Sequence, residues 1–94
     1  MQKKQEPKYM IVATADGYML ANRASGETIP YDEPVMIFRA RDVHAAEIIR
    51  EYAGRVAEPE HRAVVLERAA DFEQFAADHP NQMKEPDTAR SDLG

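Results

Sequence analysis

Residues 34–42 read PVMIFRARD, an apolar run that passes directly into a charged segment. The alternation over 35–40 predicts a strand with Met36 and Phe38 on its core face and Arg39 on the opposite face, which Arg41 shares. Asp42 is a good helix N-cap, because its carboxylate can accept hydrogen bonds from backbone N–H groups two or three residues further on. The stretch therefore predicts a strand that leads at once into a helix beginning at Val43.

Two helices are predicted after this stretch. In the first, apolar residues recur at helical spacing as far as Val56, namely Ala45, Ile48, Ile49, Tyr52, Ala53 and Val56. Pro59, preceded by Glu58, suits the first position of a second helix, and His79-Pro80 ends its periodicity. The apolar stripe of this helix consists of Val65, Leu66, Ala69, Phe72 and Ala76. The short linker over 54–58 favours an antiparallel pair.

The residues before the opening stretch predict a β-hairpin. Two apolar runs flank Asp16-Gly17, a dipeptide that favours a two-residue turn and would pair Ala15 with Tyr18. Neither face of this hairpin is strongly polar until the pairing reaches Asn22 and Arg23. An exposed edge or apolar face invites self-association, so a homodimer is one expected assembly.

The predicted fold class is α+β: an antiparallel hairpin plus a third strand packed on an antiparallel pair of helices. The polar ends predict a flexible N-terminal tail over 1–7 and a polar C-terminal tail over 80–94, with a single α+β domain over 8–79. The predicted core consists of Met36, Phe38, Ile48, Ile49, Tyr52, Val65, Ala69 and Phe72.

Composition argues against several classes of function. The 94-residue chain has no cysteine, which excludes disulfides and thiolate metal sites, and no apolar run is long enough to span a membrane. We therefore expect a cytoplasmic protein with no membrane partner. His44 and Glu47 share one helical turn, but a third ligand, His61, falls near the wrong helix end. We predict no catalytic residue, no metal and no cofactor, and hence no enzyme.

Charge is distributed unevenly. Eight acidic and eight basic residues balance within 1–57, whereas nine acidic and four basic residues lie in 58–94, which accounts for the net charge of -5. This balance disfavours nucleic acid as a partner, because a phosphate-binding surface needs the opposite sign. A local basic strip of Arg23, Arg39 and Arg41 keeps that alternative open. The acidic side chains of the second helix, among them Glu67, Asp71 and Glu73, are the other candidate binding surface.

Short motifs carry a resemblance that spans most of 9–87. They are Asp32-Glu33-Pro34, Phe38-Arg39-Ala40 with Asp42, His79-Pro80, Met83-Lys84 and Pro86-Asp87. In these the chain resembles small proteins encoded on bacterial phages, prophages and conjugative elements. The resemblance implies an accessory role in a mobile element or its host, and it transfers no functional residue.

The leading hypothesis is a non-enzymatic accessory protein that binds a host or element-encoded protein. Small inhibitors of host defence, anti-CRISPR proteins among them, are similar to it in size and charge, so inhibition of a host system is one form of this role. The alternative is a small nucleic-acid-binding accessory module that uses the basic strip.

Overall fold

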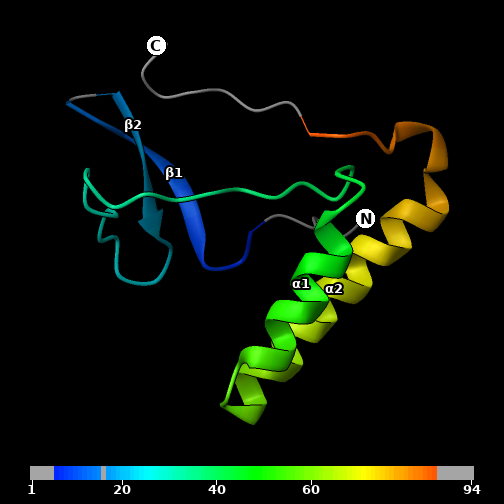
Figure 1. The fold of residues 1–94 in the computed structure, drawn as a ribbon. Coiled ribbons are helices and arrows are strands. Elements are labelled where there is room, and N and C mark those ends of the chain that lie inside the picture. The colour runs from blue at the N-terminus through cyan, green and yellow to red at the C-terminus, as the bar shows by residue number, and fades with distance from the viewer. Residues whose placement is uncertain (1–5, 16, 87–94) are drawn as a thin grey trace. The chain divides into compact units, whose positions relative to one another are not determined.

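The computed structural model describes residues 6–15 and 17–86. It has an α+β fold, with an antiparallel two-stranded hairpin and two packed helices (Figure 1). The chain divides into two compact units on either side of the Met36–Ile37 bond. The hairpin belongs to the first unit and the helices belong to the second, so each unit is described by itself. The predicted packing of the sheet on the helices stays a prediction.

The hairpin consists of β1 (Tyr9–Thr14) and β2 (Gly17–Asn22). Thr14 pairs with Gly17 and Ala13 with Tyr18, so the connection consists of residues 15 and 16, of which Asp16 lies outside the described residues. The predicted pairing of Ala15 with Tyr18 was therefore wrong by two positions. A shift of two leaves every side chain on the same face, so the apolar pattern cannot distinguish the two registers.

A tight loop follows β2 and brings the chain back along its outer edge. The side-chain oxygen of Asn22 accepts hydrogen bonds from the backbone N–H groups of Ala24 and Ser25 at 2.8 and 3.0 Å. Gly26 adopts a left-handed φ of 78° that an alanine would rarely adopt. The backbone of Thr28 then forms an isolated antiparallel bridge with Ala21.

The third strand predicted over 35–40 is not formed in the described part of the chain, where the sheet has two strands. Residues 27–29 already occupy the outer edge of β2, because the N–H of Asn22 donates to Glu27 and the N–H of Ile29 donates to Leu20. The local loop thus occupies the edge that a more distant strand would have used there. Residues 34–39 run as an irregular connection into the second unit.

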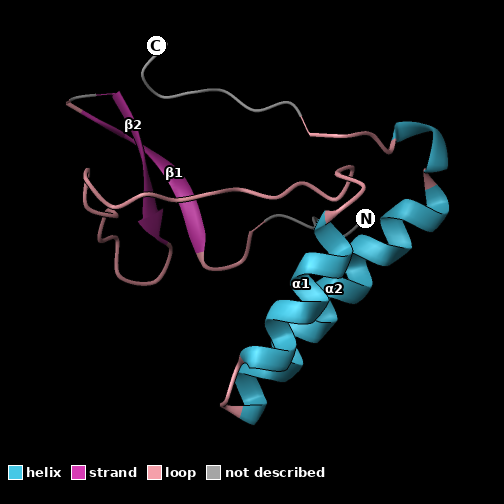
Figure 2. Cartoon of the chain, viewed as in Figure 1, coloured by secondary structure: helices cyan, strands magenta, loops and turns pink. Residues whose placement is uncertain are grey.

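The second unit contains α1 (Ala45–Arg55), α2 (Pro59–Asp78) and a short 3-10 turn, η1 (Pro80–Gln82). Figure 2 shows α1 and α2 side by side and antiparallel, as the short linker predicts. Pro59 stands in the first turn of α2, and the Glu58 carboxylate caps the helix by accepting from the N–H of Glu60 at 3.0 Å. The predicted ends of α2 are confirmed.

The start of α1 differs from the prediction. The helix begins at Ala45 rather than Val43, and the N–H of Val43 donates to the carbonyl oxygen of Lys84 at 3.0 Å. The Asp42 carboxylate still accepts a hydrogen bond two residues on, from the N–H of His44 at 2.8 Å. Asp42 therefore stabilises the turn that precedes the helix.

Alanine forms the most buried part of both units. Among the described residues the fully buried hydrophobic side chains are Ala21, Ala45, Ala53 and Ala69, and no large side chain is fully buried. The core prediction was wrong for Met36, Ile48 and Tyr52, which are 73, 44 and 59% exposed. Small residues at the contact let α1 and α2 approach closely, and larger side chains then project from the flanks.

Candidate functional site

A surface cleft lies where the chain enters α1, and Lys84, Glu85 and Pro86 form one of its walls. We call residues 80–86, to which these three belong, the C-terminal strap. The N–H of Lys84 donates to the carbonyl oxygen of Arg41 at 2.9 Å, and its own carbonyl oxygen accepts from Val43. This parallel bridge between Asp42 and Lys84 joins two segments that are far apart in sequence. The first seven residues of the predicted C-terminal tail thus have a defined structure.

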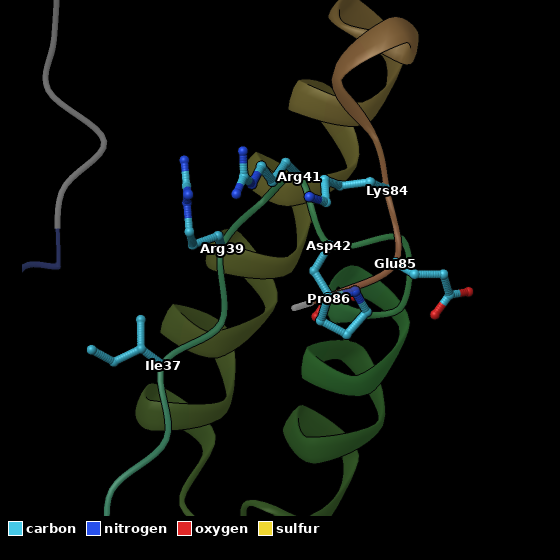
Figure 3. Close-up of a pocket in the computed structure, with 7 residues that line it drawn as sticks. All are labelled: Ile37, Arg39, Arg41, Asp42, Lys84, Glu85 and Pro86. Carbon is cyan, nitrogen blue, oxygen red and sulfur yellow. The ribbon is translucent and has the colours of Figure 1, made fainter. Parts of the chain in front are cut away.

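The cleft has a volume of about 170 Å³ and is drawn in Figure 3. We call it the cationic cleft, and it is lined by Ile37, Arg39, Arg41, Asp42, Lys84, Glu85 and Pro86. In Figure 3 the side chains of Arg39 and Arg41 extend to the same side, and the Lys84 side chain points toward Arg41. Arg39 and Lys84 are exposed and Arg41 is half-buried. Three cationic groups thus converge from two segments.

The two carboxylates of the cleft are held by other groups. Asp42 accepts from the N–H of His44, as described above, and both oxygens of Glu85 contact Nε2 of His44, at 3.0 and 2.8 Å. The hydrogen bond and charge of Glu85 raise the pKa of His44 above its usual 6.5. In Figure 3 Glu85 points away from the two arginines, so it does not neutralise them.

Arg23, the third member of the predicted basic strip, has a structural role in the hairpin unit. Its Nε donates to the carbonyl oxygen of Glu6 at 3.1 Å, and its backbone N–H donates to Lys8. These contacts hold the segment before β1 against the turn after β2. Sequence reasoning missed Lys84 as a neighbour of Arg39 and Arg41, because only a backbone bridge between distant segments brings it there.

The three predicted acidic residues of α2 do not act alike. Glu73 binds Arg50 of α1 through two hydrogen bonds, Nε to Oε2 at 2.9 Å and Nη2 to Oε1 at 2.6 Å. The arginine hydrogen bond lowers the pKa of Glu73. Asp71 forms an ion pair with Arg68 one turn away at 3.6 Å, and Glu67 is exposed. Two of the three carboxylates thus serve contacts within the helical unit.

The flank of α1 turned away from this ion pair is apolar. At ~100° per residue, Ile48 and Tyr52 lie roughly 160° around the helix from Arg50 and within ~40° of each other. Their side chains remain 44 and 59% exposed. We call this pair the apolar flank.

Groups for metal binding or membrane insertion are not assembled among residues 6–15 and 17–86. No three or more His, Asp or Glu side chains gather where they could hold a metal ion. His44 contacts Glu85, whereas His61 lies 3.8 Å from Glu58 at the other end of the helix pair. Within the same residues, neither helix has the length and apolar character that crossing a membrane would require.

Comparisons of the chain with protein-family models, with curated proteins and with solved structures find no match.

Proposed function

We propose that this protein is a non-enzymatic accessory protein that works in the cytoplasm by binding another protein through the apolar flank of α1. The observation that carries the proposal is the exposure of Ile48 and Tyr52, at 44 and 59%. On the other side of α1, Arg50 is already bound to Glu73 of α2. Burial of such side chains stabilises a complex by about 1.5–3 kcal/mol for a fully covered residue. Tyrosine is also enriched among the residues that dominate binding energy.

The charge around the apolar flank indicates the chemistry of the partner. At ~100° per residue, Arg55 and Glu51 are the charged residues of α1 beside Ile48, and they pair with each other at 3.3 Å. A partner that fits would offer an apolar pocket whose rim is polar without an excess of either charge. The resemblance to mobile-element proteins favours a host or element-encoded protein, and inhibition of a host system is one outcome of such binding.

Affinity capture with matched variants tests this function. The full chain is immobilised, and a lysate from a bacterial host is passed over the wild type, Ile48→Glu, Tyr52→Glu and the control Ala63→Glu. Ala63 is exposed on α2, so its substitution adds the same charge away from the flank. We expect a protein whose retention falls more than tenfold in the two flank variants and is unchanged in the control. Retention that does not depend on Ile48 or Tyr52 would contradict the proposal.

A second copy of the chain is one candidate partner. If the partner is a second copy, sedimentation of the wild type shows a dimer that Tyr52→Glu converts to a monomer, whereas Ala63→Glu remains dimeric. If the wild type is a monomer at every concentration, the partner of the apolar flank is a different protein.

The alternative, a small nucleic-acid-binding module, retains two residues of its predicted strip. Arg39 and Arg41 line one cleft, and Lys84 adds a third cation there. This second function is supported by that convergence and is opposed by the net charge of -5.

A further inference from the structure

We propose that Arg39, Arg41 and Lys84 form a binding site for a phosphate group in the cationic cleft. Binding to nucleic acid through this site would rest on the second function above, whereas phosphate binding itself does not. The site also needs no contribution from the apolar flank.

The first argument is the geometry of the cations. Figure 3 shows Arg39 and Arg41 extended to one side with Lys84 directed toward Arg41. A guanidinium presents N–H donors in a planar fork, and an ammonium presents three donors from a point charge. Three such groups around one cleft match an anion with at least three oxygens better than a carboxylate with two. Phosphate is the common biological anion with that shape.

The second argument is the state of the nearby acids. Among the described residues, no ion pair joins Arg39 or Arg41 to a carboxylate, and Glu85 of the cleft pairs with His44 instead. The Asp42 carboxylate accepts from a backbone N–H instead. The positive charge of the two arginines is therefore available to an incoming anion.

The third argument is the backbone that positions the cations. Hydrogen bonds of 2.9 and 3.0 Å fix Lys84 beside Arg41 and Val43. The cleft volume of about 170 Å³ is many times the ~10–15 Å³ that a cavity needs in order to hold one water, which leaves room for a phosphate group. The strap thus completes a site that the residues before α1 only begin.

Inorganic phosphate added to the isotope-labelled full chain is the first test, followed by NMR at constant ionic strength against a chloride control. We expect saturable shifts at the amides of Arg41, Asp42, Val43 and Lys84. Arg39→Gln, Arg41→Gln and Lys84→Gln should each weaken binding about three- to tenfold. Arg55→Gln is the matched control, because Arg55 is exposed and is paired with Glu51. Shifts that do not saturate, or an equal loss in the Arg55 variant, would overturn the site.

A labelled single-stranded oligonucleotide separates the two sources of phosphate. Three phosphate contacts predict that the logarithm of the binding constant falls with log salt concentration at a slope of about -2. Each of the three glutamine variants in the cationic cleft should reduce the magnitude of that slope by about 0.7. If phosphate binds at the cleft and the oligonucleotide does not bind at low salt, the ligand is a small phosphate compound and the nucleic-acid function fails. An acidic peptide that displaces phosphate at equal affinity would overturn the phosphate assignment.

Discussion

The hairpin unit and the helical unit use different means to remain ordered without a large buried side chain. In the hairpin, backbone pairing and a tight loop determine the structure, while Ile11 and Tyr18 are 70 and 80% exposed. In the helical unit, three fully buried alanines, Ala45, Ala53 and Ala69, are joined by an ion pair and a backbone bridge. The comparison teaches that the hairpin depends on backbone conformation at glycine, whereas the helices depend on small side chains at their contact.

The largest effect should come from enlarging a buried alanine of the helical unit. Ala69→Leu adds volume at a fully buried position, so we expect the free energy of unfolding to fall by about 1–3 kcal/mol. Chemical denaturation followed by circular dichroism measures it. Ala70→Leu, at an exposed neighbouring position, should change stability by less than about 0.5 kcal/mol. Equal effects at the two positions would contradict the role assigned to small residues.

A substitution in the loop after β2 should have the next largest effect. No atom would crowd a Cβ at Gly26, but its φ is 78°, so Gly26→Ala should cost the hairpin about 1–2 kcal/mol. Amide hydrogen exchange in β1 and β2 reports the change for that unit alone. Unchanged protection of the Ala21 and Asn22 amides would show that the hairpin does not depend on this glycine.

The same substitution in α1 should have the opposite sign. Gly54 lies within the helix, again with open space around its Cα, so Gly54→Ala should stabilise α1 by about 0.5–1 kcal/mol. Amide exchange in α1 measures this gain. A loss of stability at Gly54 would break the contrast between the two units.

The Arg50–Glu73 ion pair should make the stability of the helical unit decrease at acid pH. Arg50 lowers the pKa of Glu73 below its usual 4.5, so the contribution is present above that value and is lost as pH falls through the folded pKa. Glu73→Gln should flatten the pH dependence of the unfolding free energy below pH 4.5 and leave that dependence unchanged at higher pH. Parallel acid profiles for the two proteins would assign the acid dependence to other carboxylates.

The smallest effect is expected at the strap. Glu85 raises the pKa of His44, so the contact is fully present below pH 6.5 and weakens as pH rises through the folded pKa. NMR titration should show the pKa of His44 falling toward 6.5 in Glu85→Gln, with a smaller change in Glu47→Gln, because the Glu47 charge contributes least. An unchanged His44 pKa in Glu85→Gln would show that the contact between the His44 and Glu85 side chains does not form.

Sequence patterns predicted the elements whose signals are local. Pro59 and His79-Pro80 mark the two ends of α2, and the apolar runs around residue 16 give the hairpin. The third strand was wrong because residues 27–29 occupy the β2 edge through hydrogen bonds that carry no side-chain pattern. The contacts of the C-terminal strap also leave no pattern in the sequence, because they are made by backbone groups of Arg41, Val43 and Lys84.

The candidate site was predictable to the same extent. Arg39 and Arg41, two residues apart, line one cleft, although the strand predicted to place them on one face is not formed among the described residues. Arg23 is held by Glu6 instead, and Glu73 by Arg50, since both partners come from distant segments that periodicity cannot pair. The sequence therefore predicts which residues lie close together within one segment. It does not predict which residues of a distant segment contact them.

The bridge between Asp42 and Lys84 determines where the helical segment begins and ends in space. It places the entry to α1 next to the exit from η1, so the segment from Asp42 to Lys84 begins and ends at the same place. Segments whose ends lie close together tolerate insertion into a host loop and circular permutation. The turn over 56–58, whose carbonyl groups at Val56 and Ala57 bind Arg62, is the opposite end at which such a permuted chain would open.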